Sequence, residues 1–253
     1  MLPTLFRRNF NHNVNQLALK IMFPRLIFAL CLSCFTLPLV AQSVIDEDDT
    51  GAWYMYFFST RFNDSQWGMQ GDIQYRNWDL GGDLEQLLLR GGVTWTTPNN
   101  FATFTLGYGN ITTGAFGNSN STSNESRVYQ EALLKHGLGE RLRFRHRFRL
   151  EQRWVEDQDF RTRFRYAIFA DLPLNNKTIT PGTWYLAAYN EIFVNLESDI
   201  GNGRSVDTFD RNRLYGALGY SLNKTMKIQG GYMHQSTNSV DKGQIQLSLH
   251  HSF

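Results

Sequence analysis

This chain of 253 residues has few cysteines, few long apolar runs and little excess of one charge over the other. Its two cysteines, Cys31 and Cys34, precede residue 42, so beyond that point we expect no disulfide and no cysteine metal site. No apolar run after residue 41 is long enough for a helix to cross a bilayer. The formal net charge is only +2, which gives no reason to expect a nucleic-acid partner. No pattern indicates a cofactor or a metal ion.

Residues 1–41 have the pattern of an export signal. They contain four basic residues and no acid, and an apolar run extends from Leu26 to Ala41. That run is about 16 residues long, short of the roughly 20 that a membrane-spanning helix needs, so we predict cleavage after Ala41. Translation could instead begin at Met22, which starts an ordinary signal by itself. Without residues 1–41, 21 lysines and arginines face 23 acids, a net charge of −2.

The stretch RLRFRHRFRLEQRW at 141–154 carries arginine at nearly every second position. A period of two is the side-chain period of a β-strand, whereas a helix would scatter both sets of residues around its axis. One face of this strand is therefore guanidinium, and the other is mostly apolar and includes His146. The fold depends on which solvent touches each face.

The same alternation recurs along the chain. We predict eleven strands, at 51–62, 65–76, 83–96, 100–112, 125–137, 140–154, 160–171, 183–196, 209–221, 225–236 and 243–253. Most are longer than the strands of about 5–6 residues typical of soluble proteins. Their length is near the 9–11 residues that a tilted strand needs to cross a bilayer. Short turns alternate with long polar loops, near 114–124 and 197–208, as in outer-membrane barrels.

We therefore predict an all-β fold, a transmembrane antiparallel up-and-down β-barrel over residues 51–253, preceded by an acidic segment at 42–50. Apolar side chains would face lipid and polar side chains a wet interior, the inverse of a soluble sandwich. Bacterial barrels usually have an even number of strands, so we favour twelve, with residues 43–50 as the additional strand. Two alternatives stay open: this segment threads the lumen, or one boundary is wrong and the strands number ten.

Several stretches together resemble the domain-of-unknown-function 2490 family of bacterial outer-membrane proteins. They are RLRFRHRFRLEQRW with the following RTRFRYAIFADLPL, NEIFVNL at 190–196, FDRNRLYGALGY at 209–220 and GGYMHQ at 230–235. The resemblance covers most of residues 51–253. It implies a β-barrel in the outer membrane of a Gram-negative bacterium, in contact with outer-membrane lipid, and no assigned activity. Phe253 similarly resembles the aromatic end that the barrel assembly machinery reads.

The alternation also predicts which side chains line the lumen. Nine arginines on two adjacent strands should point inward: Arg141, Arg143, Arg145, Arg147, Arg149, Arg153, Arg161, Arg163 and Arg165. The carboxylates expected to face them are Glu125, Glu131, Glu151, Asp171 and Glu191. Asn195 and Arg213 share this orientation, and we expect Glu191 to pair with an arginine.

Same-face arginines about 7 Å apart repel by about 0.6 kcal/mol in water and by more in a partly dry lumen. The predicted lumen is therefore positive. It could be a hydrated structural ladder, or its excess charge could attract anions, in a narrow porin-like pore or at a binding site. An occluded bore would favour the structural or binding role.

An enzyme, for example a lipid-modifying one, is the third alternative. It would need a nucleophile, a histidine and a carboxylate or amide within hydrogen-bonding distance. The six histidines are poor candidates: His250 and His251 adjoin Ser252, but at the expected periplasmic end of an ordinary strand. We predict no catalytic residues and no enzymatic activity.

Overall fold

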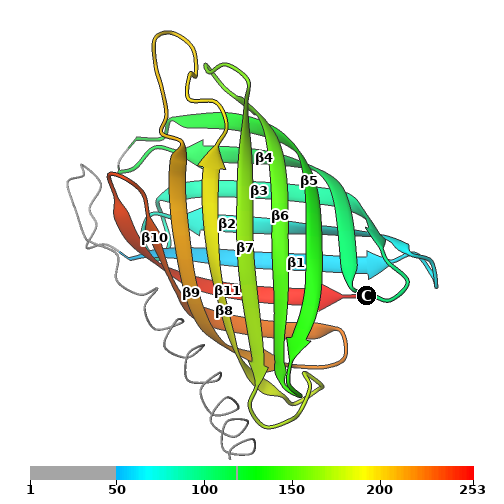
Figure 1. Ribbon diagram of the computed structural model, residues 1–253. Coiled ribbons are helices and arrows are strands. Elements are labelled where there is room, and N and C mark those ends of the chain that lie inside the picture. Colours follow the sequence, from blue (N-terminus) through cyan, green and yellow to red (C-terminus); the bar gives the residue numbers. More distant parts are fainter. Residues whose placement is uncertain (1–49, 118) are drawn as a thin grey trace, which may run out of the picture. The chain divides into compact units, whose positions relative to one another are not determined.

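A computed structural model describes residues 50–117 and 119–253 (Figure 1). The strands are β1 (Gly51–Arg61), β2 (Trp67–Asn77), β3 (Leu84–Thr96), β4 (Ala102–Gly114), β5 (Thr122–Leu138), β6 (Leu142–Val155), β7 (Arg161–Pro173), β8 (Trp184–Asn195), β9 (Phe209–Ser221), β10 (Met226–Ser236) and β11 (Asp241–Ser252). Within these ranges no helix has the length and apolarity to cross a membrane. The expected signal at 1–41 and residues 42–49 of the acidic segment lie outside the described part.

The strands form one closed barrel in which each strand pairs with its neighbours in sequence. The pairs from β1–β2 to β10–β11 are antiparallel, and β1 pairs in parallel with β11, from Gly51 opposite Gln244 to Ser59 opposite Ser252. Figure 1 shows this seam, with the first strand in blue beside the last in red. Because eleven strands alternate in direction, the first and last run the same way. The eleven predicted strand segments are thus present with small shifts at their ends. The favoured count of twelve and the fully antiparallel arrangement were wrong, because a parallel seam closes the barrel with eleven strands.

The connections fall at two ends of the barrel. The loop end carries the β1 start and the connections 78–83, 115–121, 156–160, 196–208 and 237–240. The turn end carries Phe253 and the connections 62–66, 97–101, 139–141, 174–183 and 222–225. The long 174–183 connection means that the expected contrast between short turns and long loops is weaker than the sequence indicated.

Parity separates the two faces of the sheet as the alternation requires. In β6, Arg149, Glu151 and Arg153 are buried, whereas Phe148 and Trp154 are exposed. Exposed apolar side chains recur around the barrel on almost every strand, among them Tyr54, Ile73, Leu89, Leu106, Ile192, Leu218, Tyr232 and Leu247. The outside of the barrel is therefore an apolar belt much larger than a soluble monomer normally exposes.

Inward-facing side chains from β1, β9 and β10 pack together inside the barrel. Trp53, Tyr215 and Met233 form a buried cluster in which none is more than 4% exposed. The Tyr189 ring stacks on Tyr215 at 4.8 Å, and its hydroxyl accepts a 3.0 Å hydrogen bond from Nε2 of Gln246 on β11. A water-filled channel would leave these side chains exposed. We call Trp53, Tyr189, Tyr215 and Met233 the waist cluster.

Tyr185 packs directly on Gly219 of the neighbouring strand. A Cβ at residue 219 would lie 2.3 Å from Tyr185 Cζ. Tyr185 has little room to move, because it is fully buried and its hydroxyl accepts a 3.1 Å hydrogen bond from Gln229. We expect Gly219→Ala to lower the free energy of unfolding by about 1–3 kcal/mol through overpacking, measured by urea titration of the refolded protein.

Gly91→Ala is the matched control, because a Cβ there meets no atom within 4 Å. It lies within a strand, as Gly219 does, so both substitutions change a glycine of a strand to alanine. Equal stabilities of the two variants would show that the packing of Tyr185 on Gly219 carries no energy.

Candidate functional site

Glu151 is the centre of the arginine network inside the barrel. Its side chain is 1% exposed. It accepts hydrogen bonds from Arg163 at 2.7 Å and from Arg165 at 2.6 Å. Nitrogens of Arg149 and Arg127 lie 3.7 and 4.0 Å from its oxygens. One buried carboxylate thus has four guanidinium groups within 4.0 Å, and it offsets the repulsion that the sequence pattern creates.

Two further carboxylates extend this network across the strands. Glu191 Oε1 lies 2.6 Å from Arg147 Nη2 and 2.7 Å from Arg165 Nη2. Glu131 accepts from Arg149 at 2.5 Å and from Gln70 Nε2 at 3.1 Å. Because each carboxylate bridges two partners, the network links β2 and β5–β8 and fixes their register in the lumen.

Two more carboxylates pair with arginines near the loop end. Glu125 binds Arg127 at 2.6 Å and Arg153 at 2.5 Å. Asp210 binds Arg163 at 2.7 Å and Arg211 at 3.1 Å. Both acids are therefore shared between two cations.

Three predicted ladder arginines lie at the turn end and differ from the rest. Arg145 pairs with Asp171 at 2.9 Å, and 38% of its side chain is exposed. Arg143 donates to the backbone carbonyl of Glu140 at 2.7 Å, within the β5–β6 turn. Arg141 precedes β6 and donates to the carbonyl of Pro173 at 2.6 Å. Arg141 and Arg143 thus bind backbone carbonyls instead of ladder carboxylates, because Arg141 precedes β6 and Arg143 is only its second residue, beside the β5–β6 turn.

Arg161 and Asn195 lie at the loop end. Arg161 is 6% exposed, and its Nε and Nη1 have no hydrogen-bond partner among the described residues. Asn195 donates through Nδ2 to the Asp207 carbonyl at 2.9 Å. Next to it, Glu197 accepts from the backbone N–H of Thr162 at 2.6 Å, which holds the pKa of this carboxyl below its usual range. These bonds attach the 196–208 loop to the start of β7 and to Asn195.

A cavity of about 160 Å³ lies in the loop-end half of the lumen. We call it the arginine basin, because eight arginines line it: Arg76, Arg90, Arg127, Arg153, Arg163, Arg165, Arg211 and Arg213. Glu125 is the one carboxylate in the lining, and Phe193 contributes an aromatic face. Arg76, Arg90, Arg127 and Arg211 were not among the predicted site residues. The same alternation in their strands carries the signal, although no run of arginines marks it.

Carboxylates do not balance the charge of the arginine basin. Five acids come within 4.0 Å of its eight arginines: Asp72, Glu125, Glu151, Glu191 and Asp210. Glu151 and Glu191 are also shared with Arg149 and Arg147, which lie outside the lining. Buried charge is unfavourable unless it is paired, so the basin is complementary to an anion.

Arg76 and Arg213 have no carboxylate within 4.0 Å among the described residues, although they are 4% and 6% exposed. Arg76 donates to Gln74 at 2.6 Å and lies 3.7 Å above the Trp53 ring. Arg213 donates through Nε to Gln235 at 2.8 Å and lies 4.8 Å from the same ring. Neutral amides and Trp53 therefore position both guanidiniums, and no described carboxylate forms an ion pair with either of them.

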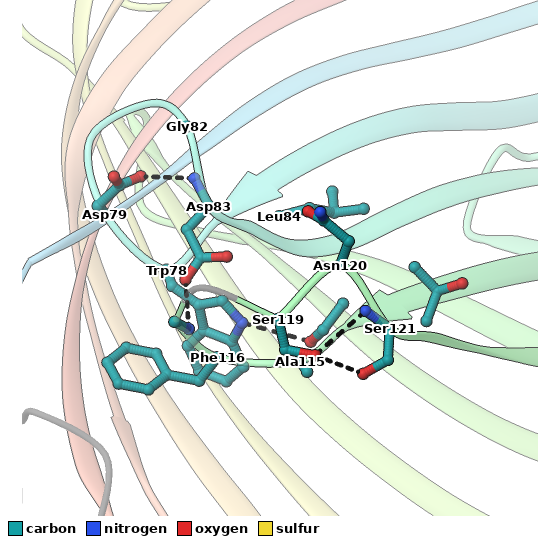
Figure 2. Close-up of a pocket in the computed structure, with 13 residues that line it drawn as sticks. Trp78, Asp79, Gly82, Asp83, Leu84, Ala115, Phe116, Ser119, Asn120 and Ser121 are labelled. Atoms are coloured by element: carbon teal, nitrogen blue, oxygen red, sulfur yellow. Dashed lines mark hydrogen bonds between the residues drawn. The ribbon is translucent and has the colours of Figure 1, made fainter.

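A second hollow, of about 620 Å³, lies at the loop end between the β2–β3 and β4–β5 loops. Figure 2 shows its aromatic wall, where Trp78 and Phe116 meet edge to face with centroids 5.6 Å apart. Asp83 accepts from the Gly117 N–H at 2.7 Å, and Asp79 accepts from the Asp83 N–H at 3.2 Å. Its carboxylates hold the two loops together and disfavour anions, so this hollow differs in sign from the arginine basin.

The histidines do not complete a catalytic set in the described part of the chain. Ser248 Oγ lies 3.0 Å from His250 Nε2, but no carboxylate hydrogen-bonds to His250, which stacks on Phe57 at 4.8 Å. His146 points outward and hydrogen-bonds the Tyr166 hydroxyl at 2.8 Å. Among the described residues, no group of three or more histidines, cysteines or acids is placed so that it could hold a metal ion. The serine–histidine pair thus lacks the third group that would orient it.

The family described as "Protein of unknown function (DUF2490)" matches residues 50–246. The chain belongs to this family. In this DUF2490 protein the matched range holds β1–β10, half of β11, the waist cluster and the whole lining of the arginine basin. No curated protein and no solved structure matches the chain.

Proposed function

We propose that this DUF2490 protein is an outer-membrane barrel of a Gram-negative bacterium that binds small anions in its lumen and does not conduct ions. The observation that carries the proposal is the arginine basin, where eight arginines have five carboxylates within 4.0 Å. Uncompensated positive charge in a buried cavity attracts anions.

The outer face supports the membrane location. The apolar belt surrounds the barrel, and strands of 11–17 residues are long enough to cross a bilayer. Aromatic pairs lie near the strand ends, with Trp154 and Phe160 5.3 Å apart at the loop end and Trp184 and Tyr220 4.7 Å apart at the turn end. Such pairs are typical of the aromatic girdles at membrane interfaces. In this proposal outer-membrane lipid contacts the belt.

The route to the membrane is part of the same proposal. Residues 1–41 direct export, and the barrel assembly machinery recognises the last strand. Phe253 supports this step, because it is 61% exposed at the turn end, where its backbone N–H donates to the Ser59 carbonyl at 3.0 Å across the seam.

The waist cluster favours a binding site over a porin-like pore. An anion that entered from the loop end would meet Trp53, Tyr215 and Met233, all buried and packed together. These side chains offer few groups to replace the hydration shell of the ion, so crossing this layer is unfavourable. In this proposal an anion enters and leaves the arginine basin from the loop end alone.

The purely structural alternative accounts for the paired arginines but not for all of them. A ladder that only fixed register would place a carboxylate beside each arginine, as Glu151 and Glu191 do for their partners. Arg76 and Arg213 instead keep an uncompensated charge in the cavity lining. We also propose that the protein is not an enzyme, since no carboxylate in the described part of the chain hydrogen-bonds to His250. Lipid or peptide hydrolysis by the refolded protein would contradict this.

We expect the refolded protein to give no steady current in planar lipid bilayers, because side chains fill the waist. A porin reconstituted in the same lipid serves as the positive control. The native protein should sediment with outer membranes and stay there until detergent is added. A stable current would overturn the closed lumen, and a protein that remained dissolved without detergent would overturn the membrane location.

A further inference from the structure

We propose that the arginine basin binds one tetrahedral dianion of the phosphate class, either free phosphate or the phosphoryl group of a phosphomonoester, with Arg213 as its principal hydrogen-bond donor and Arg76 as a second ligand that acts through its charge. This inference rests on the proposed anion-binding function and specifies its ligand. It concerns the cavity at the loop end, whose lining shares Arg127, Arg163 and Arg165 with the network around Glu151.

The size of the cavity limits the ligand to one small group. Pockets for drug-sized molecules usually measure about 300–1,000 Å³. The arginine basin, at about 160 Å³, is smaller. At roughly 30 Å³ per water molecule it holds about five waters, enough for a phosphate with little else. The remainder of a phosphomonoester would extend toward the loops.

The charge of the lining favours a dianion. Eight arginines with five carboxylates leave a formal excess of three positive charges. A chloride or an acetate compensates one of these, and a phosphate dianion compensates two. Since electrostatic interactions strengthen as water is excluded, the second charge contributes more here than at an exposed site.

The free hydrogen-bond donors favour oxygen atoms that point in several directions. Both Nη1 and Nη2 of Arg213 lack a hydrogen-bond partner among the described residues, as does Nη1 of Arg90 and of Arg153. Arginine binds phosphate through two parallel hydrogen bonds, and a phosphate has four oxygens against the two of a carboxylate. These donors come from β3, β6 and β9 around one cavity, which suits a tetrahedral ligand better than a planar one.

The test is a calorimetric titration of the full-length processed protein, refolded in detergent, at constant ionic strength. The probes are inorganic phosphate, glucose 6-phosphate, acetate and chloride. We expect saturable binding of both phosphates and at least tenfold weaker binding of acetate and chloride. A short-chain phosphatidic acid tests whether the phosphate group comes from a lipid. If the protein binds it more tightly than inorganic phosphate, the ligand is a lipid headgroup with the same phosphoryl chemistry.

Arg213→Gln and Arg76→Gln should each weaken phosphate binding at least tenfold. Arg145→Gln is the control, since Arg145 pairs with Asp171 at the turn end, away from the cavity; its affinity should equal that of the parent. Asp72→Asn changes the charge in the opposite direction, because it removes the partner of Arg90 at 2.9 Å, and should raise the affinity several-fold. This variant keeps the test decisive where a glutamine variant fails to fold.

Equal affinities for phosphate, acetate and chloride would overturn the phosphate assignment and leave the anion-binding function standing. Unchanged phosphate affinity in folded Arg213→Gln and Arg76→Gln would overturn the assignment of the two ligands. Failure of every anion to bind would overturn the proposed function itself, so the three results are distinguishable.

Discussion

Glu151→Gln is expected to lower the free energy of unfolding of the barrel by about 3–5 kcal/mol. Glutamine has nearly the same shape, so the change removes a charge without opening a cavity. It leaves Arg163 and Arg165, whose nitrogens lie 2.7 and 2.6 Å from the Glu151 oxygens, without their shared counter-ion in a buried position. Urea titration of the refolded protein, followed by tryptophan fluorescence, measures the loss.

The control for this prediction is Glu140→Gln. Glu140 pairs with Lys177 at 2.7 Å, but the two side chains are 72% and 79% exposed. Exposed pairs contribute about 0–1 kcal/mol, so this variant should unfold almost as the parent does. The double variant Glu151→Gln/Arg165→Gln should recover part of the loss, because it also removes one of the buried cations that lost a counter-ion. Equal losses in Glu151→Gln and Glu140→Gln would show that the network does not stabilise the barrel.

The same substitution links stability to the proposed ligand. A ligand that binds only the folded state stabilises it in proportion to the logarithm of its concentration above the Kd. Glu151→Gln adds uncompensated charge beside the arginine basin, since Arg127, Arg163 and Arg165 line that cavity. Phosphate should therefore raise the free energy of unfolding of this variant by more than it raises that of the parent. Acetate should raise the free energy of unfolding of the variant by less than phosphate does.

Most of the fold follows from the alternation of residue types. A period of two specifies a strand and sorts its side chains between two faces without knowledge of its neighbours. The arginine-rich strand β6 shows this best, because its odd-numbered residues point inward and Phe148 and Trp154 point outward. The eleven strand segments followed in the same way, but the favoured total of twelve was wrong, and the family came from a resemblance of several motifs. The position of each strand in the barrel also followed, since each pairs with its neighbours in sequence.

The remaining features depend on how the sheet closes, which no local pattern encodes. Parity gives the face of a residue but not its depth in the bore or its partner across it. The contact of Tyr189 on β8 with Gln246 on β11 is set by the stagger of the strands around the barrel. The parallel β1–β11 seam is likewise a property of the whole ring. For this reason Arg141 was misplaced, and Arg76 was not recognised as a partner of Arg213 above Trp53.

Removing aromatic side chains from the waist cluster should convert the closed barrel into an anion-selective pore. Tyr189 and Tyr215 stack at 4.8 Å in the middle of the bore, and neither pairs with a carboxylate. In Tyr189→Ala/Tyr215→Ala both rings are absent, so water can join the arginine basin to the turn-end half of the lumen. We expect single-channel currents in planar bilayers where the parent gives none, with a reversal potential that indicates preference for anions. Heat-modifiable mobility on gels checks that the variant is folded.

Tyr75→Ala/Tyr232→Ala is the control, because it removes two rings of the same size from the outer face, where they are 44% and 52% exposed. This variant should fold and remain closed. Adding Arg145→Glu and Arg147→Glu to the open variant should reverse its selectivity, since these residues line the path below the waist. A folded open variant that prefers cations would contradict the positive lumen. A folded Tyr189→Ala/Tyr215→Ala variant that gives no current would show that residues outside the waist cluster block the passage of ions.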